Sequence, residues 1–250
     1  MKPSSYFLLI TIFLGAFRFG QAQEATEIVR QSDLRMRGKT MQALITMQII
    51  RPKWNRSLSF KTWNKGQAYS LILVTAPARD KGQSFLKRNR EMWNWQPSIN
   101  RNVKLPSSLM GQSWMGSDFK NEDFIRESSL VHDYTHKILG SEKIGERDCY
   151  KIQLLPKPEA AVVWGKILLW ISKTDFLQLK TEMYDEEGEL VNTLQASQIK
   201  LLGGRNLPAY LEMIPADKPG HKTVIEYQSI VFDQELADDF FSIQQMKTIR

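Results

Sequence analysis

The sequence predicts a mainly β protein built on one large antiparallel sheet that a few helices cover. Many short stretches alternate apolar and polar residues, turn-forming residues separate them at short intervals, and few stretches have helical periodicity. Roughly ten strands in such a series are typical of a single sheet that curves or closes. The helices would then lie against its concave apolar face.

The clearest strand pair lies near the start of this series. Residues 57–63 (SLSFKTW) place Leu58, Phe60 and Thr62 on one face, a turn follows at 65–66, and residues 68–75 continue as a strand, so a β-hairpin is expected. The other expected strands are 41–50, 83–95, 132–139, 149–154, 164–171, 177–184, 190–202, 210–214 and 223–232. The expected helices are 24–37, which is amphipathic, 121–128 and 236–245.

Two expected strands are apolar on both faces, namely residues 71–74 (LILV) and 167–171 (ILLWI). Either each strand is buried between the sheet and a helix, or one of its faces forms the wall of a hydrophobic cavity. Periodicity alone does not separate these alternatives.

The first 22 residues have the pattern of a cleavable signal peptide. Lys2 is the positive n-region, residues 6–17 form an apolar run, and residues 20–22 (GQA) place small side chains at the −3 and −1 positions. The run is shorter than the roughly twenty residues of a membrane-spanning helix, and Arg18 ends it. We expect a single domain of residues 23–250 in the periplasm; an uncleaved anchor is the alternative.

Charge and cysteine content narrow the function further. Removal of Lys2 and Arg18 takes two positive charges from the formal net charge of +7 and leaves +5. This modest positive net charge is compatible with binding to anionic lipid head groups, but no basic run or motif predicts nucleic-acid binding. Cys149 is the only cysteine. A disulfide within the chain is therefore impossible, and an apolar core must stabilise the fold.

Candidate nucleophiles have little support in the sequence. Residues 111–115 (GQSWM) begin like the G-x-S-x-G elbow of hydrolases, but Met115 stands where the second glycine is needed. No motif surrounds Cys149, so an inert thiol is expected. The acids at 238–239 are expected at the polar start of a terminal helix. We therefore expect no enzyme and no cofactor.

Metal ligands are also weakly supported. His132 and His136 would bind one metal from a helix, but four strand residues of ~3.3 Å each set them about 13 Å apart on one face. Two solvent-facing histidines are expected instead. The acids of residues 185–189 lack the spacing of an EF-hand and are expected in a solvated turn.

A tryptophan-rich block at residues 92–119 is the most unusual part of the sequence. It begins MWNWQP, continues to SSLMGQSWMGSDF, and holds three of the seven tryptophans. With the signal sequence, the opening helix ending in MRGKT and the β-rich body, this block resembles the LolA-like outer-membrane lipoprotein-sorting proteins, in the subfamily that carries the block. The resemblance implies a half-open, strongly curved antiparallel sheet whose helices form a lid over an apolar cavity.

The same resemblance implies a non-enzymatic carrier that binds acyl chains of lipoproteins or lipids for transfer to the outer membrane. It further implies a monomer with peripheral membrane contact and, as a partner, an inner-membrane transporter or lipid-exporting pump. The alternative is an envelope-sensing or scaffolding module of the same fold that binds a protein partner.

Large rings and thioethers present apolar area at a low entropic cost, so the block supplies the expected acyl-chain ligands. These are Trp93, Trp95, Met110, Trp114, Met115 and Phe119. The residues expected to shape the loop are Pro97, which fixes its path, Gly111 and Gly116, which permit close backbone approach, and Asp118, which caps a helix near residue 121 or forms a turn. Alternatively, the block seals the mouth of the sheet with its rings in the protein's own core.

Overall fold

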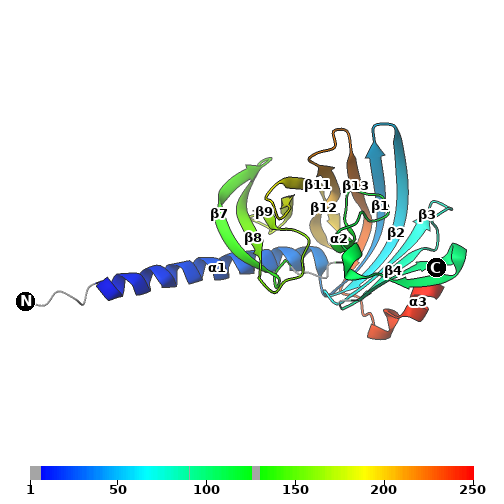
Figure 1. The fold of residues 1–250 in the computed structure, drawn as a ribbon, viewed down its shortest axis with the longest axis horizontal. Helices are drawn as coiled ribbons and strands as arrows, with labels where there is room; N and C mark the ends of the chain where they lie inside the picture. The colour runs from blue at the N-terminus through cyan, green and yellow to red at the C-terminus, as the bar shows by residue number, and fades with distance from the viewer. Residues whose placement is uncertain (1–6, 90, 126–129) are drawn as a thin grey trace, which may run out of the picture.

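The computed structural model describes residues 7–89, 91–125 and 130–250, and in these residues thirteen strands form one antiparallel sheet (Figure 1). The strands are β1 (Thr40–Arg51), β2 (Trp54–Lys65), β3 (Tyr69–Ala76), β4 (Ser84–Arg88), β5 (Glu91–Gln96), β6 (Arg101–Lys104), β7 (Tyr134–Ile144), β8 (Arg147–Pro156), β9 (Lys166–Ser172), β10 (Gln178–Tyr184), β11 (Leu190–Leu202), β12 (Arg205–Pro215) and β13 (Lys222–Phe232). Their spatial order is β6-β5-β4-β3-β2-β1-β13-β12-β11-β10-β9-β8-β7. The curved antiparallel sheet predicted from the sequence is confirmed, and it is open, with β6 and β7 as its edges, and not a closed barrel.

Three α-helices and three short 3-10 turns accompany the sheet in the described residues. They are α1 (Phe7–Arg37), α2 (Asn121–Ile125), α3 (Ile243–Thr248), η1 (Pro97–Ile99), η2 (Ser107–Leu109) and η3 (Asp238–Phe240). None of these helices combines the length and apolar character that crossing a membrane requires, within the part of the chain that the structure describes.

Several element boundaries differ from those expected. The single strand expected at 83–95 is a hairpin of β4 and β5, because Asn89 takes a left-handed φ of 53° and Arg88 pairs back with Glu91. β6 was not expected at all. The opening helix begins at Phe7, well before residue 24, and the terminal helix divides into η3 and α3. The expected helix at 121–128 ends at Ile125, and residues 126–128 lie outside the described residues.

The two faces of the sheet have separate cores. On the concave face, buried residues of α1, most strands and the loop before β7 form one cluster, here called the concave core. On the opposite face, α3 packs near β4 and β5 (Figure 1), and this second group is here called the α3 cluster. The members of the α3 cluster are Leu71, Leu73, Leu86, Trp95, Phe241, Met246 and Ile249.

This arrangement explains the apolar run of residues 71–74. Ile72 and Val74 belong to the concave core, whereas Leu71 and Leu73 contact the α3 cluster. One face of this run is therefore covered by the α3 cluster, and on the other face Ile72 also borders a cavity. In the second run, on β9, the Trp170 ring lies between two lysines that pair with it across the sheet, with the Lys151 and Lys180 ammonium groups 4.8 and 4.4 Å from the ring centroid.

α1 lies along β7 and β9 and contributes Ala25, Ile28 and Val29 to the concave core (Figure 1). Its cover buries His136 of β7, which was expected to face solvent; only His132, which precedes the strand, is exposed. The His136 Nε2 atom is 2.7 Å from the carbonyl oxygen of Leu130, and Nδ1 is 3.0 Å from the hydroxyl of Thr26. Burial lowers the pKa of His136 from its ordinary value.

Candidate functional site: a cavity on the concave face

A cavity of about 300 Å³ lies between the concave face of the sheet, α1 and the loop before β7. Strands on both sides of β1 contribute to its wall, so it lies near the middle of the curved sheet. Its apolar lining includes Ile45, Phe60, Ile72, Trp114, Met213 and Ile225. The volume is at the lower end of the range typical of small-molecule sites.

Trp114 is the largest fully buried side chain of this wall. It is 1% exposed and its ring lies between two phenylalanines, with centroids 5.2 Å from Phe60 and 5.2 Å from Phe85. Both contacts are tilted, a geometry that aromatic pairs favour. Because Phe60 is on β2 and Phe85 is on β4, Trp114 fixes the loop over the strands on one side of the cavity.

The loop of residues 105–120, here called the covering loop, is also held by a buried ion pair. Arg51 Nη1 on β1 lies 2.9 Å from Asp118 Oδ2, and the two side chains are 9% and 7% exposed. The hydroxyl of Thr223 on β13 donates to the same Asp118 oxygen, at 2.6 Å. Arg51 also donates to the carbonyl oxygens of Gly116 and Lys222, both at 3.1 Å. The covering loop is thus tied to the centre of the sheet.

Of the two roles expected for Asp118, helix cap or turn former, capping of α2 is wrong. Its carboxylate contacts Arg51 and Thr223, and the backbone N–H of Lys120 instead donates to the Asp123 carboxylate, at 2.8 Å. Asp118 does not act as the cap because a tertiary contact, the ion pair with Arg51 on β1, holds its carboxylate.

The two glycines of the covering loop have different roles from those expected. A Cβ atom at Gly111 or at Gly116 would meet nothing within 4 Å. The prediction that these glycines permit a close approach of the backbone is therefore wrong for both. Gly116 is needed for its φ of +82°, which follows a φ of 52° at Met115 and turns the chain sharply. Pro97 begins η1, which joins β5 to β6.

The alternation of β5 separates the first tryptophans of the block from the cavity. Met92 is buried in the concave core, whereas Trp95 is buried in the α3 cluster and Trp93 packs against that cluster. Lysine ammonium groups lie over both rings, Lys104 at 5.7 Å from Trp93 and Lys247 at 5.5 Å from Trp95. These two rings face away from the cavity.

Of the six expected ligand residues, Trp114 and Phe119 line the cavity. Met110 is buried in the concave core without lining it, and Met115 is partly buried against that core. The block therefore supplies two rings to the cavity, two to the opposite face and two thioethers to the packing around the covering loop.

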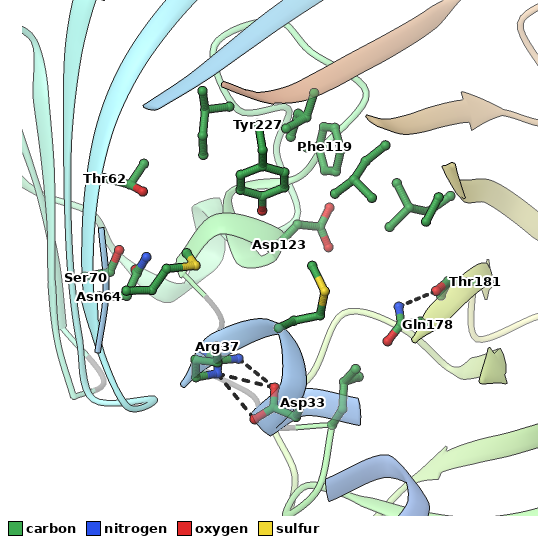
Figure 2. A pocket seen from close by; sticks show the side chains of 18 of the residues that line it. Asp33, Arg37, Thr62, Asn64, Ser70, Phe119, Asp123, Gln178, Thr181 and Tyr227 are labelled. Atoms are coloured by element: carbon green, nitrogen blue, oxygen red, sulfur yellow. Dashed lines mark hydrogen bonds and ion pairs between the residues drawn. The ribbon is translucent and has the colours of Figure 1, made fainter. Parts of the chain in front are cut away.

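The structure adds cavity residues that the sequence analysis missed. α1 turns Val29, Ser32, Asp33, Met36 and Arg37 toward the cavity. Their spacing is that of one helix face, and this signal was available in the sequence. Polar groups also ring the cavity in Figure 2: Asp33 and Arg37 from α1, Thr62, Asn64 and Ser70 from β2 and β3, Gln178 and Thr181 from the β10 side, and Asp123 and Tyr227 beside Phe119.

Two contacts of Arg37 hold the C-terminal end of α1 beside the cavity. Arg37 forms an ion pair with Asp33, with 2.9 Å between Nη2 and Oδ1. Arg37 Nη1 also donates to the carbonyl oxygen of Gly66, at 3.4 Å, in the turn between β2 and β3. The C-terminal end of α1 is therefore attached to the β2–β3 hairpin.

The two candidate nucleophiles, Ser113 and Cys149, are respectively hydrogen-bonded to the backbone and buried. The Ser113 hydroxyl donates to the backbone carbonyl of Ser117. Cys149 is buried, and burial raises the pKa of its thiol, which keeps it protonated at neutral pH. Within the described ranges, no group of three or more His, Cys, Asp or Glu side chains could hold a metal ion.

Comparisons with known proteins place this fold. A family model described as an uncharacterized protein matches residues 66–248. The solved structure of a DUF1329 family protein from Desulfovibrio piger has a TM-score of 0.82 at 24% identity and covers 90% of this chain and 99% of that one. The structure of a LolA superfamily protein from Nitrosomonas europaea has a TM-score of 0.76 at 24% identity, and the match covers 88% of this chain and 98% of that one. The structure of an outer membrane lipoprotein-sorting protein domain from Vibrio parahaemolyticus has a TM-score of 0.80 at 20% identity, and the match covers 90% of this chain and 99% of that one. A search of curated proteins found no match. The fold is therefore LolA-like, as in these solved structures.

Proposed function

We propose that this chain, which belongs to the family whose model spans residues 66–248, is a non-enzymatic carrier that binds acyl chains of lipoproteins or lipids. The observation that supports the proposal is the cavity of about 300 Å³ on the concave face, whose wall is largely apolar. An apolar wall lowers the free energy of a bound hydrocarbon chain because it removes that chain from water.

The size of the cavity sets a limit on the chain that it takes in this form. If a CH₂ group occupies about the same ~30 Å³ as a water molecule, the cavity holds about ten of them. Each buried CH₂ contributes about 0.8 kcal/mol, which is about a fourfold gain in affinity. Affinity should therefore rise steeply with chain length up to about ten carbons and then level off, unless α1 or the covering loop moves outward.

We further propose that residues 1–22 are a signal peptide, that residues 23–250 work as one domain in the periplasm, and that the tryptophan-rich block marks a subfamily. A periplasmic carrier would receive its cargo from an inner-membrane transporter or lipid-exporting pump and release it at the outer membrane. Peripheral contact with lipid head groups is compatible with the positive net charge of the chain.

The test is displacement of a fluorescent fatty acid by straight-chain carboxylic acids of six to sixteen carbons. A cavity-filling variant, Ala196→Leu, should weaken probe binding at least tenfold because it adds three carbons to the lining. Ser197→Leu is the matched control, since Ser197 is the exposed neighbour on the same strand. Equal binding by the wild type and both variants would mean that the probe does not enter the cavity.

Native mass spectrometry of the protein from its own host's periplasm separates the carrier from a protein-binding module. The carrier should copurify with lipid. A module that binds a protein partner should show no bound lipid, and its partner complex should be unaffected by Ala196→Leu.

A further inference from the structure

The wall formed by β1 to β4 changes in polarity from one end of the cavity to the other. The strand register places Met41, Asn64, Ser70 and Lys87 in one row across the four strands, Ala43, Thr62, Ile72 and Phe85 in the next, and Ile45, Phe60 and Val74 in the third. The first row is thus mainly polar and the third is wholly apolar. The polar row is close to the β2–β3 turn, where Arg37 of α1 is attached through the carbonyl oxygen of Gly66.

Two buried hydroxyls on residues that line the cavity have no hydrogen-bond partner. They are the hydroxyls of Ser32 on α1 and Thr62 on β2, whose residues are 3% and 7% exposed, and both residues line the cavity. Among the described residues, neither oxygen has a donor or an acceptor within reach. Thr62 is seen on the cavity wall in Figure 2. A buried polar group without a partner is unfavourable, so two such groups on one cavity indicate that a ligand completes them.

The charges around the cavity favour a neutral ligand group. Arg37 is paired with Asp33, and Lys180, which also lines the cavity, lies 2.7 Å from Glu182. The remaining charged side chains of the lining are one cation, Lys87, and one anion, Asp123. With no excess of either sign, a buried carboxylate or phosphate would have no uncompensated cation to offset its desolvation.

We propose that the cavity recognises an acyl ester, with the ester carbonyl oxygen accepting hydrogen bonds from Ser32 and Thr62 and the hydrocarbon chain extending toward Phe60 and Trp114. This assignment rests on the proposed acyl-chain function and specifies the ligand's polar group. A carbonyl oxygen has two lone pairs and can accept from both hydroxyls, and an ester has no donor that would itself be left unpaired. Ser32 and Thr62 are then specificity residues, while the apolar lining supplies affinity.

The experiment uses three competitors of a fluorescent fatty acid, namely methyl decanoate, decane and decanoic acid, with the full mature chain. Each competitor is measured against the wild type and against Ser32→Ala and Thr62→Val, which remove one hydroxyl each. The ratio of wild-type to variant affinity cancels the competitor's own hydrophobicity. Thr193→Val is the matched control, because Thr193 precedes Leu194 of the lining and therefore lies on the other face of β11.

The expected result is a three- to tenfold weaker affinity of methyl decanoate for Ser32→Ala and for Thr62→Val, with the affinity of decane unchanged. Thr193→Val should leave both unchanged. Thermal melts of the empty variants should be no lower than that of the wild type, since each substitution removes an unpartnered polar atom.

Three outcomes overturn the ester assignment. If decane and methyl decanoate lose affinity equally, or if neither loses any, the hydroxyls do not recognise the carbonyl, and the carrier function stands. If decanoic acid responds to the variants and methyl decanoate does not, the polar group is a carboxylate. Failure of all three competitors to displace the probe would instead contradict the carrier function itself.

Discussion

The buried ion pair between Arg51 and Asp118 should determine whether the covering loop stays on the concave face. Asp118→Ala removes the only carboxylate that the structure places on the Arg51 guanidinium among the described residues. Arg51 would keep backbone carbonyl partners, of Ile50 at 2.8 Å and of Gly116 and Lys222 at 3.1 Å, but would remain a buried cation without a counter-charge.

The magnitude follows from the burial of both partners. Removing one member of a buried pair destabilises a protein by about 3–5 kcal/mol, because the other charge stays desolvated. For a chain of this size each kcal/mol lowers the melting temperature by about 2–4 °C. Asp118→Ala should therefore lower it by about 6–20 °C. The double variant Arg51→Met with Asp118→Leu should recover most of this loss, since apolar replacement of a buried pair is often neutral or stabilising.

The assays are thermal and urea unfolding followed by tryptophan fluorescence, with acrylamide quenching in the native state. Release of the covering loop would expose Trp114, which is 1% exposed in the intact structure, and should increase quenching. The control is Glu91→Ala, which breaks a pair with Lys104 in which both side chains are more than half exposed, and which should change stability by less than about 1 kcal/mol. The reasoning is refuted if Asp118→Ala is as mild as this control, or if the double variant is as unstable as the single one.

Three further predictions concern other parts of the fold. Burial lowers the pKa of His136 below 6.5, so the unfolded chain binds a proton at this residue at a higher pH than the folded chain does. The free energy of unfolding should therefore fall as the pH drops through 6.5, by at most ~1.4 kcal/mol per pH unit. His136→Gln should remove this dependence, whereas His132→Gln should not. Gly116→Ala should destabilise by about 1–2 kcal/mol because of its positive φ, whereas Gly111→Ala should not destabilise. Met246→Ala, in the α3 cluster, should cost about 2–5 kcal/mol and leave probe binding unchanged.

Each of these predictions has a clear contrary result. An unchanged pH profile in His136→Gln would show that another group titrates in that range. Equal melting temperatures for the two glycine variants would mean that the turn at residue 116 relaxes without strain. Loss of probe binding in Met246→Ala would show that the two faces of the sheet are coupled.

The strand pattern could be predicted because it depends on neighbouring residues. Leu58, Phe60 and Thr62 were placed on one face from alternation alone, and Phe60 and Thr62 both line the cavity. The same rule, applied to β5, would have put Trp93 and Trp95 together on the face opposite Met92. What alternation could not supply is which of the two faces becomes concave, because that depends on where α1 and α3 pack.

Long-range contacts account for the rest of what the sequence did not reveal. Asp118 meets Arg51 across 67 residues of chain, and His136 is buried by a helix whose Thr26 lies 110 residues earlier. No local pattern identifies such partners. The unpartnered hydroxyls of Ser32 and Thr62 also could not be predicted from the sequence. No local pattern in the helix or the strand indicates that both residues line one cavity.

The tryptophan-rich block therefore has two structural roles, packing against the α3 cluster and holding the covering loop, and its composition does not distinguish them. Trp93 and Trp95 are strand residues that contact the α3 cluster, so substituting them should loosen α3 and lower stability without changing the cavity wall. Trp114 lies in the covering loop between Phe60 and Phe85, so substituting it should change both the cavity wall and the attachment of that loop. If acyl chains enter by displacement of the covering loop, the Trp114 contacts and the Arg51–Asp118 pair must break together, and a less stable loop should then speed both the uptake and the release of the probe.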